Sequence, residues 1–324
     1  MPDYPIMGGK LLKTIPAEVE RDRWGRPYVV PPGATKPTSY QRCTTFIDVI
    51  ESTFNLSQWQ QRKVAEGLAQ RPDLVLAAAV AGEDKAKLNK IVADAKEAAK
   101  AHTAATTGTA LHELTEMYDR GQGLPAGLSA ATQADVDAYI AATAGLKMIA
   151  VEQFLVWDAA KDAGTCDRIV TIDGKRYIAD LKTGSIEYGA LKISMQLSVY
   201  ARSTTYDVKT HERKITGVDT ARGLVIHLPA GSGQCEVHWV DLAPGNAAVA
   251  TAQAIHRHRK VKAKDLYAPY AAAGAADPVL EAIAAAPSPD ACRALWAQHE
   301  AAWTDAHTAA AKQRLAELSA TVAG

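Results

Sequence analysis

The first half of the chain shows mostly helical periodicity of its apolar residues. Residues 1–40 are rich in Pro, Gly and aromatic residues, which predicts short strands and turns. From Ser57, a candidate helix cap, the apolar spacing indicates an amphipathic helix. Its apolar stripe consists of Leu56, Trp59, Val64 and Leu68. The helices expected next are one or two mostly exposed ones within the Ala-rich residues 72–102, one at about 107–120, and one from the cap Ser129 to about Lys147.

The second half changes to runs that are typical of strands. Asp173-Gly174 separates two β-rich runs and is the strongest local hairpin signal in the chain. The elements expected here are strands at 151–157, 165–172 and 175–182, a helix at about 187–203, strands at 215–228 and 235–242, and a helix from Pro244 to about Lys264. The sequence then becomes rich in Ala, Gly and Pro, and it ends in a helical pattern that carries Leu295, Trp296 and Trp303.

This order of elements predicts an α/β fold with a mixed central β-sheet flanked by helices, an N-terminal helical region and a C-terminal helical hairpin. We expect one domain over residues 1–267, of which 1–104 form an N-terminal strand and helical region. A linker at 268–288 and the helical hairpin at 289–324 should follow.

The predicted hairpin places two aspartates opposite each other. If Asp173-Gly174 is a two-residue turn, facing residues have numbers that sum to 347, so Asp167 faces Asp180. Lys182 lies two residues beyond Asp180 and should project from the same face. Two opposed carboxylates on a half-buried sheet repel each other and require positive charge. A divalent cation such as Mg²⁺, with Lys182 beside it, would supply that charge.

An alternative interpretation is that Asp167 and Asp180 are surface residues near a turn. Their charge would then be satisfied by Arg168, Lys175 or Lys182, and no metal would be needed. A β-bulge would also break the inferred register.

Composition changes this picture little. The chain has 324 residues, of which 48% are hydrophobic and 22% charged, and 36 basic residues balance 36 acidic ones. The zero net charge gives no evidence for a nucleic-acid partner, so a nuclease would need its basic residues near the site. The chain shows neither a signal-peptide pattern nor an apolar run long enough to span a membrane, so we expect a cytoplasmic protein without a membrane partner. Its four scattered cysteines predict reduced, unpaired thiols.

Four motifs resemble the PD-(D/E)xK nuclease superfamily, in particular its RecB-type branch, which includes many phage exonucleases. The branch shows GxxxH, GxxD, (D/E)xK and QxxxY in that order. The matching segments are Gly108-Thr-Ala-Leu-His112, Gly164-Thr-Cys-Asp167, Asp180-Leu-Lys182 and Gln196-Leu-Ser-Val-Tyr200. The match covers about residues 105–205 and implies a restriction-endonuclease-like core.

The resemblance implies that His112, Asp167 and Asp180 are ligands of Mg²⁺ or Mn²⁺. Lys182 would orient or help deprotonate the attacking water and stabilise the transition-state charge. Glu152 is a candidate additional ligand or a residue that supports the ligands, because relatives often carry an acidic residue on this strand. One subset of the family holds an iron–sulfur cluster on grouped cysteines. Cys235 and Cys292 are isolated, so no such cluster is expected here.

A second group of residues is expected to contact nucleic acid. Gln196 and Tyr200 share a helix face that Lys192 extends by one turn, and in the family this helix lies beside the active site. Without the motif, Tyr200 could equally be a core residue. Arg42, beside two threonines, is a candidate phosphate contact.

Together these residues predict a metal-dependent DNA phosphodiester hydrolase, an exonuclease in phage-type recombination or DNA end processing. A phage-encoded chain would act in the host cytoplasm, with a single-strand annealing or recombination protein as a candidate partner. The alternatives are a structure-selective endonuclease with the same site and a non-catalytic nucleic-acid-binding or assembly protein on the same fold.

Overall fold

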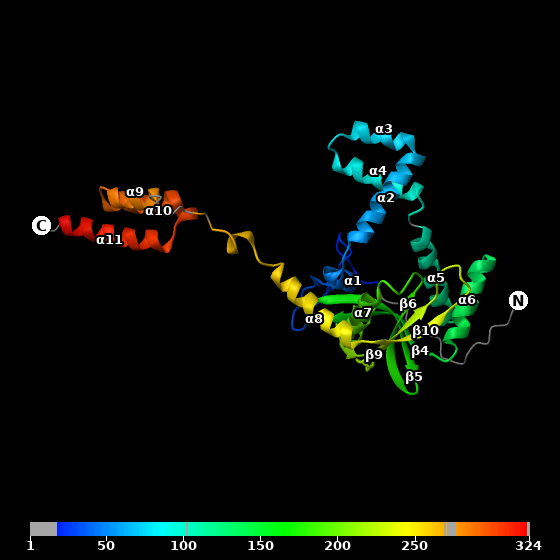
Figure 1. The fold of residues 1–324 in the computed structure, drawn as a ribbon. Helices are drawn as coiled ribbons and strands as arrows, with labels where there is room; N and C mark the ends of the chain where they lie inside the picture. Colours follow the sequence, from blue (N-terminus) through cyan, green and yellow to red (C-terminus); the bar gives the residue numbers. More distant parts are fainter. Residues whose placement is uncertain (1–17, 102, 269, 271–276, 323–324) are drawn as a thin grey trace. The chain divides into compact units, whose positions relative to one another are not determined.

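The computed structural model describes residues 18–101, 103–268, 270 and 277–322, and the chain divides into two compact units, residues 1–260 and 261–324 (Figure 1). Each unit has its own hydrophobic core. In the described residues, every helix is too short or too polar to cross a membrane.

The first unit is built on a mixed central sheet, as the order of elements predicts. Its eight strands lie in the order β10-β9-β6-β5-β4-β7-β8, with β3 paired to β5, and a separate small sheet joins β1 to β2. The strands are β1 (Tyr28–Val29), β2 (Thr38–Ser39), β3 (Gln41–Arg42), β4 (Lys147–Trp157), β5 (Asp162–Ile172), β6 (Lys175–Lys182), β7 (Thr204–Tyr206), β8 (Arg213–Ile215), β9 (Arg222–His227) and β10 (Glu236–Asp241). Antiparallel ladders join β4, β5 and β6, whereas β6 and β9 run parallel.

Helices cover both faces of this sheet (Figure 1). One face packs against α1, α7 and α8 through a core that includes Phe46, Met195 and Val249. The other face packs against α5 and α6 through a core that includes Leu111 and Tyr139. The helices of the unit are α1 (Cys43–Ile47), α2 (Phe54–Gln70), α3 (Pro72–Ala81), α4 (Lys85–Ala98), α5 (Thr103–Asp119), α6 (Ala130–Thr143), α7 (Ala190–Arg202) and α8 (Ala243–His258), with a 3₁₀ turn η1 (Asp48–Ile50). The α/β class predicted from the sequence is confirmed.

The hairpin between β5 and β6 has the predicted register. Asp173 and Gly174 have φ values of 48° and 78°, as a two-residue type I′ turn requires. The ladder runs from Ile172 opposite Lys175 to Arg168 opposite Ala179, and every pair sums to 347. The turn chemistry of Asp-Gly therefore fixes which residues of the two strands meet.

The two strands part just beyond this ladder. Strand β3 pairs with β5 at residues 162–163, so the GxxD segment 164–167 lies between the β3 and β6 pairings. Cys166 and Ile169 both belong to the core beneath α7, although strict alternation would place them on opposite faces. Strand β5 is therefore irregular between these residues. The direct pair of Asp167 with Asp180 expected from the sequence is not part of the ladder, because the regular pairing ends one residue earlier.

Several boundaries differ from the prediction. Helix α2 begins at Phe54, so Ser57 lies inside it and is not its cap, and Leu56 and Trp59 of the predicted stripe are exposed. The segment predicted as one strand at 215–228 contains the end of β8 and all of β9, separated by Gly217 at a φ of 67°. Strand β7 was not predicted. Ser129 does cap α6, since its hydroxyl accepts a hydrogen bond from the Thr132 amide.

The described residues of the second unit form three α-helices where a linker and a hairpin were expected. They are α9 (Pro278–Ala285), α10 (Pro289–His299) and α11 (Asp305–Val322), with 3₁₀ turns η2 (Ala263–Asp265) and η3 (Glu300–Ala302). Helix α9 lies within residues 268–288, the predicted linker. Asp277 caps its N-terminus, since the Asp277 carboxylate accepts from the Val279 amide, and the helix buries Val279 and Ile283. The Ala-rich composition concealed this short capped helix.

Candidate metal centre

Asp180, Lys182 and Gln196 form a closed set of contacts at the end of β6. The Lys182 ammonium lies 2.5 Å from Asp180 Oδ2 and donates to Gln196 Oε1 at 3.1 Å. The Gln196 amide donates to Asp180 Oδ1 at 3.0 Å. The Asp180 side chain is 2% exposed and that of Lys182 30% exposed. The in-phase position of Lys182 beside Asp180 is thus confirmed, and the helix α7 residue Gln196 braces both.

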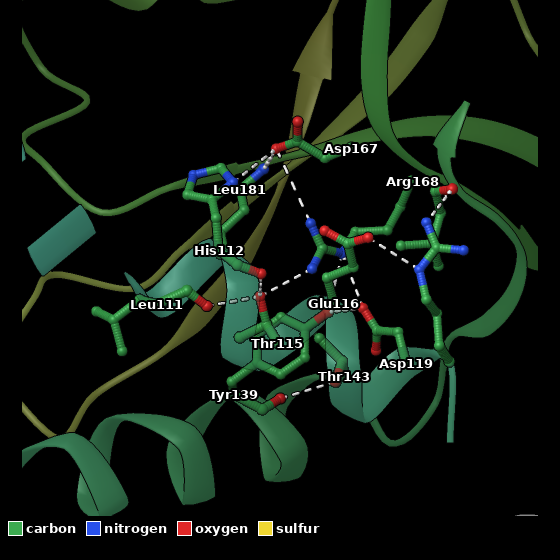
Figure 2. A network of polar contacts seen from close by, with 12 residues as sticks. Leu111, His112, Thr115, Glu116, Asp119, Tyr139, Thr143, Asp167, Arg168 and Leu181 are labelled. Carbon is green, nitrogen blue, oxygen red and sulfur yellow. Dashed lines mark hydrogen bonds and ion pairs between the residues drawn. The ribbon is translucent and has the colours of Figure 1, made fainter. Parts of the chain in front are cut away.

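Asp167 engages the opposite side of the sheet. Its Oδ2 accepts from the Leu181 backbone amide at 2.8 Å and lies 3.6 Å from His112 Nδ1 on α5 (Figure 2). The carboxylate therefore bonds to the β6 backbone just where the ladder has ended. The two aspartates lie where β5 and β6 part, and one contacts α5 whereas the other contacts α7. Asp180 is buried, whereas the Asp167 side chain is 14% exposed, and Lys182 supplies one of the positive charges that the alternative without a metal requires.

Burial shifts the pKa values of both aspartates and of His112. Burial, followed by the charge of Asp167, raises the pKa of Asp180 to about 6 despite the nearby Lys182 ammonium. Burial likewise raises the pKa of Asp167, although Arg168 opposes that shift. Burial and then the Arg168 charge lower the pKa of His112, which favours the neutral imidazole. Neutral imidazole is the form that binds metals.

These donor types suit a divalent cation. Carboxylate oxygens are the usual ligands of Mg²⁺, and an imidazole nitrogen is accepted readily by Mn²⁺. As the side chains stand, no three His, Cys, Asp or Glu residues of the described ranges are arranged as a metal-binding group. One oxygen of Asp180 is engaged by Lys182 and the other by Gln196. The fit therefore rests on the chemistry of the donors, with His112, Asp167 and Asp180 as the residues that would hold the ion.

Glu152 on β4 lies opposite Asp167 on β5, because the pairs Val151–Arg168 and Gln153–Cys166 lie on either side of them. Its φ of 53° is in the left-handed region, which is uncommon for a residue with a side chain. Burial, then the charges of Asp167 and Glu116, raise the pKa of Glu152 to about 7. Its role as an additional ligand stays a prediction.

A cleft of about 810 Å³ opens beside Glu152. Its lining residues are Glu18, Val19, Glu20, Arg21, Glu116, Glu152, Phe154 and Thr165. Glu116, which the sequence analysis did not place in the site, pairs with Arg120 at 2.9 Å. Its position one turn after His112 on α5 was the signal that could have found it. The acidic lining makes this cleft a poor place for phosphate unless cations are bound.

A buried arginine behind Asp167 is the main feature that the sequence did not predict (Figure 2). Arg168 is fully buried and donates to Asp119 Oδ2 and Thr115 Oγ1, each at 2.8 Å. Its Nε also lies 3.1 Å from the Tyr139 hydroxyl, and its Nη1 lies 4.0 Å from Asp167 Oδ2. Arg168 thereby ties β5 to α5 and α6 and places a fixed positive charge behind Asp167.

Two motif glycines are required by close packing. A Cβ atom on Gly108 would lie 2.5 Å from Thr183 Oγ1, and one on Gly164 would lie 2.9 Å from the Tyr200 hydroxyl. Gly108 thus lets α5 approach the segment that follows Lys182. Gly164 lets α7 approach β5. Both contacts set the position of a helix that carries a site residue.

The residues predicted to contact nucleic acid differ in their exposure to solvent. Tyr200 is 3% exposed and packs in the core against Gly164, which agrees with the core position that the sequence left open, and its contact with nucleic acid stays a prediction. Lys192 lies on the surface of α7 and forms an ion pair with Asp48. Arg42 is exposed at the end of β3. Contacts of Lys192, Arg42 and Gln196 with nucleic acid stay predictions.

The four cysteines are free in this structure, with Cys43 and Cys166 in the core of the first unit. Comparison with known proteins adds no further information on the site, because neither a protein-family model nor a curated protein matches the chain.

Proposed function

We propose that this protein is a metal-dependent DNA phosphodiester hydrolase, and specifically an exonuclease of phage-type recombination or DNA end processing. The observation that supports it most is the position of two pairs, Asp167 with His112 and Asp180 with Lys182, where β5 and β6 part. The four residues come from two strands and a helix, and the family resemblance assigns a role to each of them.

The roles follow from the contacts. His112, Asp167 and Asp180 would hold the ion, which when bound polarises the scissile phosphate and carries part of its developing charge. Gln196 holds the Asp180 carboxylate and the Lys182 ammonium in fixed orientation through two hydrogen bonds. The ammonium can position water at Nζ and offset charge on the phosphate in the transition state. Arg168 keeps Asp167 in place from behind and is too deeply buried to reach substrate.

The test is cleavage of linear and covalently closed circular DNA with Mg²⁺, with Mn²⁺ and with a chelator. The proposal expects degradation of linear DNA by either ion, intact circles, and no cleavage with the chelator. Nicking of circles would identify the structure-selective endonuclease. Binding of DNA without any cleavage would favour the non-catalytic protein and contradict the proposal.

A further inference from the structure

The second unit carries an apolar groove of about 450 Å³ between α10 and α11. The lining residues are Cys292, Arg293, Trp296, Trp303, Thr308, Ala311, Lys312 and Leu315. Residues 308, 311, 312 and 315 recur at helical spacing and form one face of α11. Cys292 is buried at the bottom, whereas Trp296 is 51% exposed. A hollow of this size accommodates one or two large apolar side chains.

The groove is held in a fixed shape. The Trp303 indole donates to Thr308 Oγ1 at 3.0 Å and lies 5.4 Å from the His307 ring, centroid to centroid. His307 is buried and pairs with Asp277 at 2.7 Å, which ties α11 to the start of α9. One wall is therefore preformed, which reduces the entropy lost when a ligand binds.

Charge is distributed unevenly around this unit. Residues 277–322 contain six acidic side chains and three basic ones, Arg293, Lys312 and Arg314. Arg314 donates to the Ala286 carbonyl. The other two basic residues both line the groove, and no acidic residue does. The exposed pair of Arg293 with Asp290 is a weak one that a ligand can replace.

We propose that this groove docks an acidic amphipathic segment of a partner protein. An apolar side chain of that segment enters between Trp296 and Trp303, and its flanking carboxylates pair with Arg293 and Lys312. Tryptophan and arginine are the residue types that most often dominate binding energy at interfaces. The second unit thus acts as a recruitment module for the proposed nuclease.

Other occupants match the groove less well. Residues 1–17 of this chain carry Lys10 and Lys13 against Asp3, so their charge has the same sign as the rim. Nucleic acid could stack on indole rings, but two rim cations, of which Arg293 is already paired with Asp290, attract a phosphate backbone poorly. An acidic peptide is therefore the ligand that the charge pattern favours.

The experiment measures binding of a fluorescein-labelled probe peptide to the full-length protein by fluorescence anisotropy. The probe is a short helix-forming peptide with Leu and Phe on one face and Asp and Glu on the others. Its control has Lys at every acidic position. We expect the acidic probe to bind and the basic control to bind at least about tenfold more weakly.

Two variants with matched controls locate the site. Trp296→Ala should weaken binding about tenfold or more, and Lys312→Glu about three- to tenfold. Trp239→Ala removes an indole that is also 51% exposed, on β10 of the first unit, and should bind the probe normally. Lys85→Glu reverses an exposed charge on α4 and should also leave binding unchanged. Circular dichroism checks that all four variants fold.

Equal binding of the acidic and basic peptides, or normal binding by Trp296→Ala, would overturn the proposal. Displacement of the probe by single-stranded DNA would reassign the groove to nucleic acid. Self-association that Trp296→Ala abolishes would reassign it to a second copy of the chain. Cleavage of bare DNA by Trp296→Ala should equal that of the wild type. Failure of the docking proposal is therefore distinguishable from failure of the proposed nuclease activity.

Discussion

Carboxyl groups on strands β5 and β6 occur in two contrasting settings. Asp162, at the start of β5, is fully buried, and neither carboxyl oxygen has a hydrogen-bond partner among the described residues. Burial alone raises its pKa well above the usual range. Five residues on, Asp167 accepts from a backbone amide and lies beside His112, and Asp180 is held by Lys182 and Gln196. Asp162 is thus a buried carboxyl group without donors, whereas Asp167 and Asp180 each accept a hydrogen bond.

The difference lies in the partners and not in the degree of burial. A carboxyl group without donors becomes protonated, because an isolated charge in a low dielectric is costly. The Lys182 ammonium, the Arg168 guanidinium and the Leu181 amide lie close to the Asp167–Asp180 pair and oppose the rise in pKa that burial causes. A buried aspartate is thus a candidate ligand only where the fold supplies such neighbours.

The largest expected effect comes from Asp180→Asn. This change removes a charged oxygen donor from the centre while preserving shape, so cleavage should fall on the order of a hundredfold or more. Binding of DNA, measured by electrophoretic mobility shift with the chelator present, should remain close to wild type. Asp162→Asn is the matched control, since it changes a buried aspartate of the same sheet and should cleave normally. Equal activity of the two variants would contradict the contrast between these aspartates.

Lys182→Ala should reduce turnover by about a hundredfold, because the ammonium serves the water and the charged transition state. The measurement is the cleavage rate as a function of Mg²⁺ concentration. The maximal rate should fall, while the half-saturating Mg²⁺ concentration changes little. Lys182→Arg should recover little activity, because a guanidinium is bulkier and does not give up its proton. A variant that only required more Mg²⁺ would show that Lys182 serves the ion instead.

His112→Ala should reduce cleavage at least about tenfold in Mg²⁺. High Mn²⁺ concentrations should restore part of the activity, since the two carboxylates still bind that ion. Because the pKa of His112 is lowered, the wild type should keep the neutral imidazole below pH 6.5. The measurement compares the cleavage rates of the wild type and the variant in Mg²⁺ and in Mn²⁺. An equal loss of rate with both ions would show that His112 supports the fold instead.

The smallest effect concerns Asp162 and the pH dependence of stability. In the folded protein its pKa is raised, so between about pH 4 and that value the unfolded chain binds fewer protons than the folded one. Its contribution therefore lowers the free energy of unfolding as pH rises, by up to about 1.4 kcal/mol per pH unit. Asp162→Asn removes this pH-dependent loss. The free energy of unfolding of the variant, minus that of the wild type, should therefore increase from pH 5 to pH 8. Urea unfolding at several pH values measures both free energies of unfolding. A difference between them that did not change with pH would mean that Asp162 has a partner.

The hairpin shows how much local sequence can predict. Asp173-Gly174 specifies a turn that needs two positive φ values, and the turn fixes every facing pair up to Arg168 and Ala179. The position of Lys182 beside Asp180 follows from the two-residue period of a strand. These inferences depend on interactions within about twenty consecutive residues. No knowledge of the remaining chain is needed for them.

Arg168 and Tyr200 show where such reasoning ends. Arg168 lies in a strand beside Asp167, but its partners Thr115, Asp119 and Tyr139 come from helices that the local pattern does not orient. Tyr200 shares a helix face with Gln196, yet one reaches the site and the other packs against Gly164. Helical spacing gives the face but not the depth at which each residue lies.

The sequence by itself determined the α/β class, the hairpin register and the identity of the charged residues at the candidate centre, because these follow from periodicity, turn chemistry and residue type. Only the tertiary structure decided that β5 and β6 part at Asp167, that Asp167 turns to α5 while Asp180 turns to α7, and that a buried guanidinium lies behind them. It also decided that residues 277–322 form three packed helices. Contacts between distant segments depend on how helices pack against the sheet, and a linear pattern does not encode that geometry directly.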